Sequence, residues 1–238
     1  MHIAICIWGL CRSSQYTYDS FKIHILDKLA EFGFTYEILL HTYTLDQPFT
    51  NLRTGEFGCK LDNTAWKLFN PIKSIIEDQN AVDEILDLHK YRTHGDPWGT
   101  NFGNTTFDNH IHALYSLKQV TSLVPVGCDA IMYCRPDVRY MYPLQKEWFA
   151  PELLTSCVQI PNFQKHPIND RFCLAAPPLC RVFGTRFDDA YEFSKHNELH
   201  SERFLLHSFK KHGIVIREIQ FNFKRIRANG GDGDKNIN

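Results

Sequence analysis

The chain opens with an apolar run, an amphipathic segment and a second apolar run. His2–Trp8 is almost continuously apolar, which is typical of a strand buried on both faces. Apolar residues then recur at helical spacing from about Thr17 to Phe32, and Gly33 ends the predicted helix. Tyr36–Tyr43 predicts a second strand. The order of strand, helix and strand predicts a βαβ unit and therefore a parallel sheet.

The rest of the chain alternates less regularly between helix and strand. Helices are predicted from about Asp78 to Lys90 and from about Phe107 to Leu123, and Asp129–Cys134 predicts a buried strand. The second half mixes short strands and helices, predicted at Val158–Pro161, Arg171–Ala175, Arg181–His196, Ser201–His212, Ile214–Ile219 and Phe221–Arg227. We therefore expect an α/β fold with one domain over residues 1–230, built on a Rossmann-like, mostly parallel central sheet with flanking helices and a small mixed subsheet. The glycine-rich residues 231–238 are expected to form a flexible tail.

The composition narrows the possible partners. The 238 residues include 26 Lys and Arg against 27 Asp and Glu, so the net charge is −1 and nucleic-acid binding is not expected. No apolar run approaches the roughly 20 residues of a membrane span. The first apolar run has no basic segment before it and ends at Gly9, so it predicts a strand rather than a signal peptide. None of the eight cysteines forms a CxxC pair, and reduced thiols in a cytoplasmic protein are expected.

The near-neutral total hides an uneven distribution of charge. From Arg203 to Arg227 the chain has seven basic residues and one acid, Glu218, so this segment carries +6 and the remainder −7. Arg225 and Arg227 lie two residues apart, which places both on one face of a strand. Such a pair can hold a diphosphate and stabilise it as a leaving group without a metal ion. The alternative is a solvated edge strand that its charges protect from pairing.

Three predicted strand ends are candidates for a ligand site: Gly9–Ser14, His41–Tyr43 and Arg135–Asp137. Ligands of open α/β sheets bind beyond the carboxyl ends of the strands. Arg12 can pair with a phosphate through its planar guanidinium, although a tight turn with a surface arginine explains the same pattern. The loop after the first strand is neither a Walker A nor a GxGxxG sequence, which argues against kinases, NTPases and dinucleotide enzymes.

Asp137 follows the buried strand Asp129–Cys134, where a carboxylate can hold a sugar hydroxyl or a metal–diphosphate. Mg²⁺ or Mn²⁺ prefers such oxygen ligands, but only one acid is present here. The alternative is that the neighbouring arginines, Arg135 and Arg139, simply neutralise Asp137 in a turn.

Two acids are candidates for a general base that deprotonates an acceptor hydroxyl. Glu202 begins a predicted helix, where an acid also complements the helix dipole. Asp170 lies in a turn, where Arg171 can pair with it. His110 and His112 are two residues apart on a predicted helix, so they point to different sides and cannot chelate one ion.

The order of these motifs resembles the small GT-A-type glycosyltransferases of large DNA viruses, including chloroviruses, and of some bacteria. The resemblance extends nearly to Gly230 and is carried by Gly9-Leu10-Cys11-Arg12-Ser13, Tyr36–Tyr43, Ala113-Leu114-Tyr115-Ser116-Leu117-Lys118, Tyr133-Cys134-Arg135-Pro136-Asp137-Val138, Asn169-Asp170-Arg171-Phe172, Leu199-His200-Ser201-Glu202 and Arg225-Ile226-Arg227-Ala228-Asn229-Gly230.

The resemblance implies a glycosyltransferase that moves a hexose or pentose from a nucleotide-sugar, with UDP as the expected nucleotide, to a hydroxyl of an acceptor glycan with inversion. Residues 1–140 would bind the donor and residues 141–230 the acceptor. The implied site residues are Glu202 as the base with Asp170 as second choice, Arg225 and Arg227 on the diphosphate, and Gly9, Arg12, Ser13, Thr42, Tyr43, Arg135 and Asp137 around the donor.

The sequence departs from the family at its Asp-x-Asp metal motif. Arg135-Pro136-Asp137 occupies the corresponding place, so the first acid is replaced by arginine. Binding of Mn²⁺ or Mg²⁺ by Asp137 is therefore in doubt. A viral protein of this kind would act in the host cytoplasm, with a glycan on a viral glycoprotein as one possible acceptor.

Two other classes of protein fit parts of the sequence. A sulfotransferase that uses a nucleotide sulfate would also need an anion-binding loop such as Gly9–Ser14, but the glycine- and lysine-rich continuation is missing. A glycan-binding module without catalysis could stack sugars on Trp98, Tyr140, Tyr142 and Trp148, which are otherwise expected in the core or in an acceptor-site wall.

Overall fold

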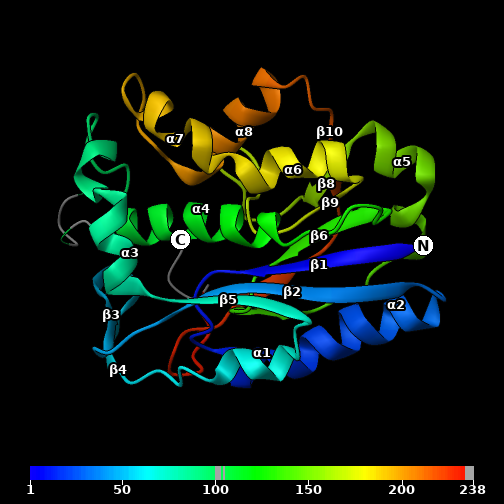
Figure 1. Cartoon of the computed structure of the whole chain (residues 1–238), viewed down its shortest axis with the longest axis horizontal. Helices are drawn as coiled ribbons and strands as arrows, with labels where there is room; N and C mark the ends of the chain where they lie inside the picture. Colours follow the sequence, from blue (N-terminus) through cyan, green and yellow to red (C-terminus); the bar gives the residue numbers. More distant parts are fainter. Residues whose placement is uncertain (100–102, 104, 234–238) are drawn as a thin grey trace.

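A seven-stranded sheet forms the centre of the protein in a computed structural model, which describes residues 1–99, 103 and 105–233. Its strands are β1 His2–Trp8, β2 Thr35–Thr44, β5 Lys73–Asp78, β6 Ala130–Cys134, β8 Val158–Pro161, β9 Cys173–Ala175 and β10 Ile216–Ile219. They are ordered β10-β8-β9-β6-β1-β2-β5, and only β9 runs antiparallel to its neighbours (Figure 1). The predicted α/β fold with a mostly parallel sheet is confirmed.

Strand β1 is buried on both faces, as its continuous apolar sequence predicts. Ile3, Ile5 and Ile7 point to one face and join one core cluster, whereas Cys6 and Trp8 point to the opposite face and join another. This division follows from the two-residue period of a strand. Parallel neighbours β2 and β6 pair with β1 on either side, so the carboxyl end of β1 lies between two other strand ends.

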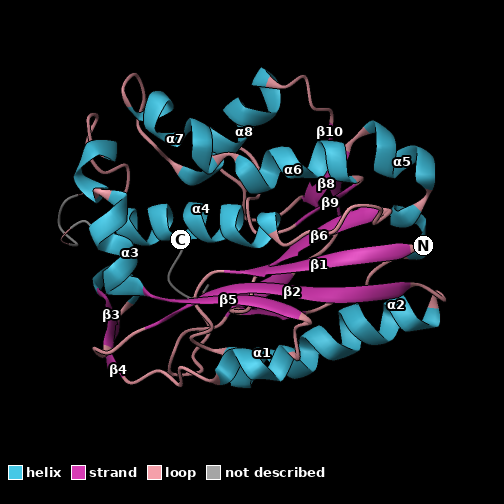
Figure 2. Ribbon diagram, viewed as in Figure 1, coloured by secondary structure: helices cyan, strands magenta, loops and turns pink. Residues whose placement is uncertain are grey.

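Helices cover both faces of the sheet (Figure 2). One face is covered by a continuous helical segment, which consists of α1 Ser14–Phe21, a π-helical turn η1 Lys22–Leu26 and α2 Asp27–Glu31. The other face is covered by α4 Thr105–Ser122 and α6 Pro177–Thr185, with α8 Ser201–Lys211 packed against α6. The remaining helices are peripheral: α3 Gln79–Leu86, α5 Pro151–Ser156, α7 Phe187–Ser194 and the short turns η2 Leu52–Thr54, η3 Ala65–Phe69, η4 Leu88–Tyr91 and η6 Lys146–Phe149.

The prediction of a single helix over Arg181–His196 is wrong. The chain forms α6 and α7 instead, and the break falls at Arg186. Arg186 is only 3% exposed, and its Nη1 donates to the carbonyl oxygen of Phe183. The guanidinium of Arg186 packs on the ring of Phe183, and the apolar periodicity of the segment does not reveal this.

Two further elements escaped the sequence pattern. Strand β5 contains only two apolar residues, Ile75 and Ile76, because it is the half-buried edge of the sheet. The hairpin of β3 Phe49–Asn51 and β4 Glu56–Cys59 lies between Tyr43 and Asp78, where the sequence pattern predicts neither helix nor strand. Its strands are too short to show an alternating pattern.

The C-terminal segment packs close to the end of β6. The last strand, β11 Phe223–Arg225, is shorter than predicted and pairs antiparallel with β7 Val138–Tyr140. The chain then folds back: the amide of Arg227 donates to Gly231 O, and the amide of Gly233 donates to Arg225 O. Residues 231–233, which the sequence assigns to the tail, are thus held against the last strand, and residues 234–238 lie outside the described part of the chain.

Two expectations from composition bear on the chain as a whole. All eight cysteines are free thiols, and seven of them are buried. Within the described residues, no helix has both the length and the apolar character needed to cross a membrane.

Candidate active site

A cleft of about 770 Å³ lies at the carboxyl ends of β1, β2 and β6. Strand order changes direction between β1 and β6, which is where open α/β sheets bind ligands. The walls of the cleft come from these strand ends, the β3–β4 hairpin, the first half of α4, the loop before β9, the start of α8 and the C-terminal segment. Among the described residues, eight arginines and three carboxylates line the cleft: Arg12, Arg53, Arg135, Arg171, Arg186, Arg203, Arg225 and Arg227, with Asp137, Asp170 and Glu202.

Gly9 begins the loop that leads from β1 into this cleft. Its φ of 95° lies in the region that only glycine adopts readily. Its amide donates to Ser116 Oγ at 2.8 Å, and Ser116 Oγ lies 2.7 Å from His41 Nδ1. His41 Nε2 in turn lies 2.8 Å from Glu77 Oε2. This buried chain of polar contacts fixes the loop on α4 and β2.

Asp137 is bound by two arginines at the end of β6. Arg135 donates to both of its oxygens at 2.7 Å, and Arg12 Nη2 donates to Oδ2 at 2.8 Å. Burial alone would raise the pKa of Asp137, but the charges of Arg135 and Arg12 outweigh it and hold this pKa well below its usual range. Asp137 is therefore ionised although it is fully buried, because the guanidinium groups of Arg135 and Arg12 surround its carboxylate.

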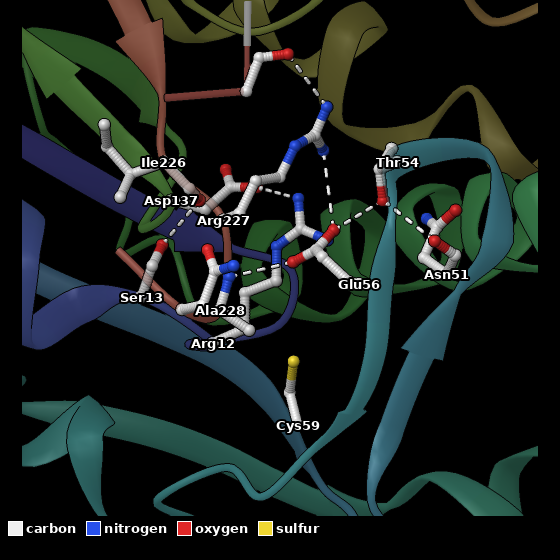
Figure 3. Close-up of polar contacts among 12 residues, drawn as sticks. Arg12, Ser13, Asn51, Thr54, Glu56, Cys59, Asp137, Ile226, Arg227 and Ala228 are labelled. Atoms are coloured by element: carbon white, nitrogen blue, oxygen red, sulfur yellow. Dashed lines mark hydrogen bonds and ion pairs between the residues drawn. The ribbon is translucent and has the colours of Figure 1, made fainter. Parts of the chain in front are cut away.

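Glu56 joins the same cluster from the β3–β4 hairpin (Figure 3). Its Oε2 accepts from Arg12 Nη1 at 3.2 Å and lies 3.6 Å from Arg227 Nη1, while its Oε1 accepts from the amide of Ala228 at 2.8 Å. Thr54 Oγ1 donates to Glu56 at 2.6 Å. Through Glu56, the hairpin is attached to both the loop after β1 and the C-terminal segment.

The donor set at Asp137 does not fit a divalent cation. Both of its oxygens already accept hydrogen bonds from arginines, whose positive charges oppose a metal ion at the same place. Across the described residues, moreover, no three His, Cys, Asp or Glu side chains are grouped as metal ligands would be. The metal-ligand role considered for Asp137 thus has no supporting geometry among the described residues.

Glu202, in the first turn of α8, also lines the cleft. Its side chain is buried, and Arg171 Nη2 lies 3.5 Å from its Oε1. Burial and the nearby charge of Asp170 raise the pKa of Glu202 to about 8, against the opposing charge of Arg171. In contrast, Arg171 and Arg186 lower the pKa of Asp170 despite its burial. The pKa values of the two neighbouring carboxyl groups are therefore shifted in opposite directions, upward for Glu202 and downward for Asp170.

Three of the arginines that line the cleft, Arg53, Arg225 and Arg227, are near enough for Arg225 to affect the pKa of the other two. Burial lowers the pKa of Arg227 to about 10, and the charges of Arg12 and Arg225 add to this effect. Burial and the charge of Arg225 likewise lower the pKa of Arg53, on the hairpin. Like charges that influence one another in this way repel, and an anion bound between them would offset the repulsion. The arrangement is suited to a diphosphate.

The structure brings nine of the eleven predicted site residues to the cleft. They are Gly9, Arg12, Tyr43, Arg135, Asp137, Asp170, Glu202, Arg225 and Arg227. Ser13 and Thr42 are buried behind it and make structural contacts instead: Ser13 Oγ donates to Ile226 O at 2.9 Å, and Thr42 Oγ1 accepts from the amide of Cys11 at 3.2 Å.

The aromatic residues considered for sugar stacking separate into different environments. Tyr140 and Trp148 are buried and pack against Phe221, with ring centroids 5.3 Å apart in both cases. Tyr142 is 52% exposed, away from the cleft lining, and only Trp98 faces the cleft. These four residues therefore form no common sugar-binding surface.

Sequence reasoning missed four charged residues of this region: Arg53, Glu56, Arg171 and Arg186. Arg171 is adjacent to Asp170 and was considered only as its turn partner. Arg53 and Glu56 lie in the irregular-looking hairpin segment, and Arg186 lies inside an apparently continuous helix. No spacing in the sequence connects these residues, because the chain places them together only on folding.

Comparison with known proteins yields similarity of structure only. No protein-family model matches the sequence, and no curated protein matches it significantly. Mouse xyloside xylosyltransferase 1 is 12% identical, with a TM-score of 0.43 over 92% of this chain and 85% of that one. The galactosyltransferase LgtC is 13% identical, with a TM-score of 0.45 over 91% and 73%. A glycosyltransferase involved in glycosylation of the major capsid of PBCV-1 is 7% identical, with a TM-score of 0.39 over 92% and 82%. At these scores the likeness concerns general chain course and carries no information on activity.

Proposed function

We propose that the protein is a glycosyltransferase that moves a sugar from a nucleotide-sugar, with UDP as the nucleotide, to a hydroxyl group of an acceptor glycan. The observation that carries the proposal is the juxtaposition, in one cleft at the strand ends, of an arginine-rich wall and a buried glutamate whose pKa is raised. Such a cleft combines a site for an anionic leaving group with a proton acceptor.

The arginine-rich wall supports the leaving-group half of the proposal. As the bond between the anomeric carbon and the diphosphate oxygen breaks, negative charge develops on the diphosphate. Arg53, Arg225 and Arg227 line the cleft and repel one another, so they are already arranged for an anion. Fixed charges of this kind stabilise developing charge without reorganising.

Glu202 supports the acceptor half of the proposal. In its ionised form it takes the proton of the acceptor hydroxyl, whose oxygen attacks the anomeric carbon while the bonding electron pair leaves with the diphosphate. Attack from the face opposite the leaving group inverts the anomeric centre. A pKa near the working pH makes a carboxylate a more effective base, and burial supplies that shift here.

Calorimetry with a panel of UDP-, GDP- and CMP-sugars, with and without Mn²⁺, tests the proposal. We expect one or more UDP-sugars to bind, and UDP to be released when an acceptor glycan is added. Lack of binding by every nucleotide-sugar would refute the proposal. An adenosine nucleotide sulfate belongs in the same panel, because selective binding of that compound would favour a sulfotransferase instead.

A further inference from the structure

A group of cleft residues takes part neither in the diphosphate contacts nor as the base, Glu202, of the proposed function. Trp98, Asn109, His110, Asp170 and Arg186 all line the cleft. The rings of Trp98 and His110 are in edge contact, with centroids 5.6 Å apart. His110 and Arg186 both influence the charge state of Asp170, so the five residues form one neighbourhood. We call it the sugar subsite.

Buried polar atoms in this subsite lack partners. Asn109 Nδ2, His110 Nε2 and Arg186 Nε are enclosed and accept or donate no hydrogen bond within the described part of the protein. His110 is 8% exposed and Arg186 is 3% exposed, so bulk water does not compensate. Leaving a buried polar atom unpaired costs about 1–3 kcal/mol. Polar side chains retained at this cost indicate that a bound molecule or ordered water completes them.

The two charged groups of the subsite, Asp170 and Arg186, both line the cleft and influence each other's charge state without forming an ion pair. The guanidinium of Arg186 packs 4.3 Å from the centroid of the Phe183 ring, and its Nη1 donates to Phe183 O. Among the described residues, no carboxylate forms a salt bridge with it. Asp170 likewise makes no ion pair or hydrogen bond with a described residue, although the charges of Arg171 and Arg186 keep it ionised. An acceptor and a donor of hydrogen bonds are therefore both available in the cleft.

We propose that the sugar subsite binds the uncharged sugar ring of the nucleotide-sugar, with Asp170 and Arg186 recognising its hydroxyl groups. A hydroxyl both donates and accepts, so one hydroxyl satisfies the carboxylate and the guanidinium together. Trp98 supplies an apolar wall for the sugar ring, since ligand pockets combine aromatic walls with a few polar groups that orient the ligand.

This inference rests on the proposed function and assigns Asp170 a role in specificity. An ionised Asp170 with a lowered pKa is a weak proton acceptor, so Glu202 remains the base while Asp170 binds the sugar. The consequence is measurable, because UDP alone lacks the sugar. Residues of the subsite should affect the affinity for UDP-sugar and leave the affinity for UDP nearly unchanged.

The experiment compares calorimetric titrations of UDP and of the UDP-sugar that binds best, using the full chain. For Asp170→Asn and Arg186→Met we expect at least tenfold weaker binding of the UDP-sugar, with UDP affinity changed less than about threefold. Arg181→Met on α6, whose Nη2 donates to Val124 O outside the cleft, is the matched control and should change neither.

Because Arg186 is buried, its variant is checked by thermal melting, and Trp98→Ala provides a half-buried loop substitution with the same expected outcome. Equal weakening of UDP and UDP-sugar, or no weakening of either, in the folded variants would overturn the subsite. Failure of the unmodified protein to bind any nucleotide-sugar would instead overturn the proposed function, and the subsite with it. The two failures are thus distinguishable.

Discussion

Arg12 Nη2 donates to Asp137 Oδ2 at 2.8 Å, joining the loop after β1 to the end of β6. The same guanidinium reaches Glu56 on the β3–β4 hairpin through Nη1. Together with Arg135 and Arg227, these residues form a cluster of three arginines and two carboxylates with one net positive charge. The cluster therefore does two things at once: it ties separate segments together and leaves the cleft positive.

Asp137→Asn is expected to destabilise the protein by about 3–5 kcal/mol, because it leaves Arg12 and Arg135 buried without their carboxylate. Urea unfolding followed by circular dichroism measures the loss. The control is Asp188→Asn: its carboxylate is 55% exposed and pairs with Lys118, so the expected cost is about 0–1 kcal/mol. Equal effects of the two substitutions would show that the Asp137 cluster does not hold the fold together.

Glu202→Gln is expected to lower the rate of sugar transfer by about 10²–10⁴-fold while sparing donor binding, because the amide cannot accept the proton of the acceptor. Release of UDP in the presence of an acceptor measures the rate, and calorimetry measures binding. Glu198→Gln is the matched control from the loop just before α8, where a 51%-exposed Glu198 side chain pairs with Arg203. Retained turnover in Glu202→Gln would remove the assignment of Glu202 as base.

Much of the sheet was predictable because its central strands carry unambiguous patterns. A strand buried on both faces, such as β1, has an almost uninterrupted run of apolar residues. The ends of that run in the sequence therefore predict the ends of the strand. Edge strand β5 is half-buried and contains two apolar residues, too few to distinguish it from a loop. At the break between α6 and α7, Arg186 is buried and donates to Phe183 O, and the apolar periodicity of the segment does not distinguish this from a continuous helix.

The candidate site was predictable where it depends on strand ends and not where it depends on side-chain pairing. The position of Asp137 after β6 follows from the sequence, as does the convergence of Gly9 and Arg135. The sequence does not show that two arginines bind both oxygens of Asp137, since one of them, Arg12, is 125 residues away. Likewise, the partner of Arg12 on the hairpin, Glu56, became visible only in the folded chain.

The stability of the protein should depend on pH through Glu202. Its pKa is raised in the folded state to about 8, so the unfolded chain ionises first as pH increases and the folded state becomes relatively less stable. This loss develops from about pH 4.5, the ordinary glutamate pKa, up to about pH 8 and is constant above. Glu202→Gln should therefore melt progressively higher than the unmodified protein across this range. A melting difference that does not vary with pH would contradict the raised pKa.

Arg225→Ala is expected to weaken UDP binding by about 10–100-fold, the effect of losing one charge-assisted contact to a phosphate. The reason is that Arg225 lines the cleft beside Arg53 and Arg227. Calorimetry at two ionic strengths measures the change. The exposed Arg139 on the neighbouring strand β7 provides the control, Arg139→Ala, which should leave UDP affinity unaltered. Equal losses in both variants would indicate a general effect of net charge.

Ser116→Ala should disturb donor binding although Ser116 lies outside the cleft. Its hydroxyl is buried and accepts the hydrogen bond of the Gly9 amide, so removal leaves that amide and His41 Nδ1 without partners at a cost of about 1–3 kcal/mol. Because the loop from Gly9 carries Arg12, we expect both a lower melting temperature and weaker UDP binding. Ser122→Ala, at an exposed position of the same helix, should change neither. A Ser116→Ala protein that loses stability but binds UDP normally would show that the contact holds the core without positioning the loop.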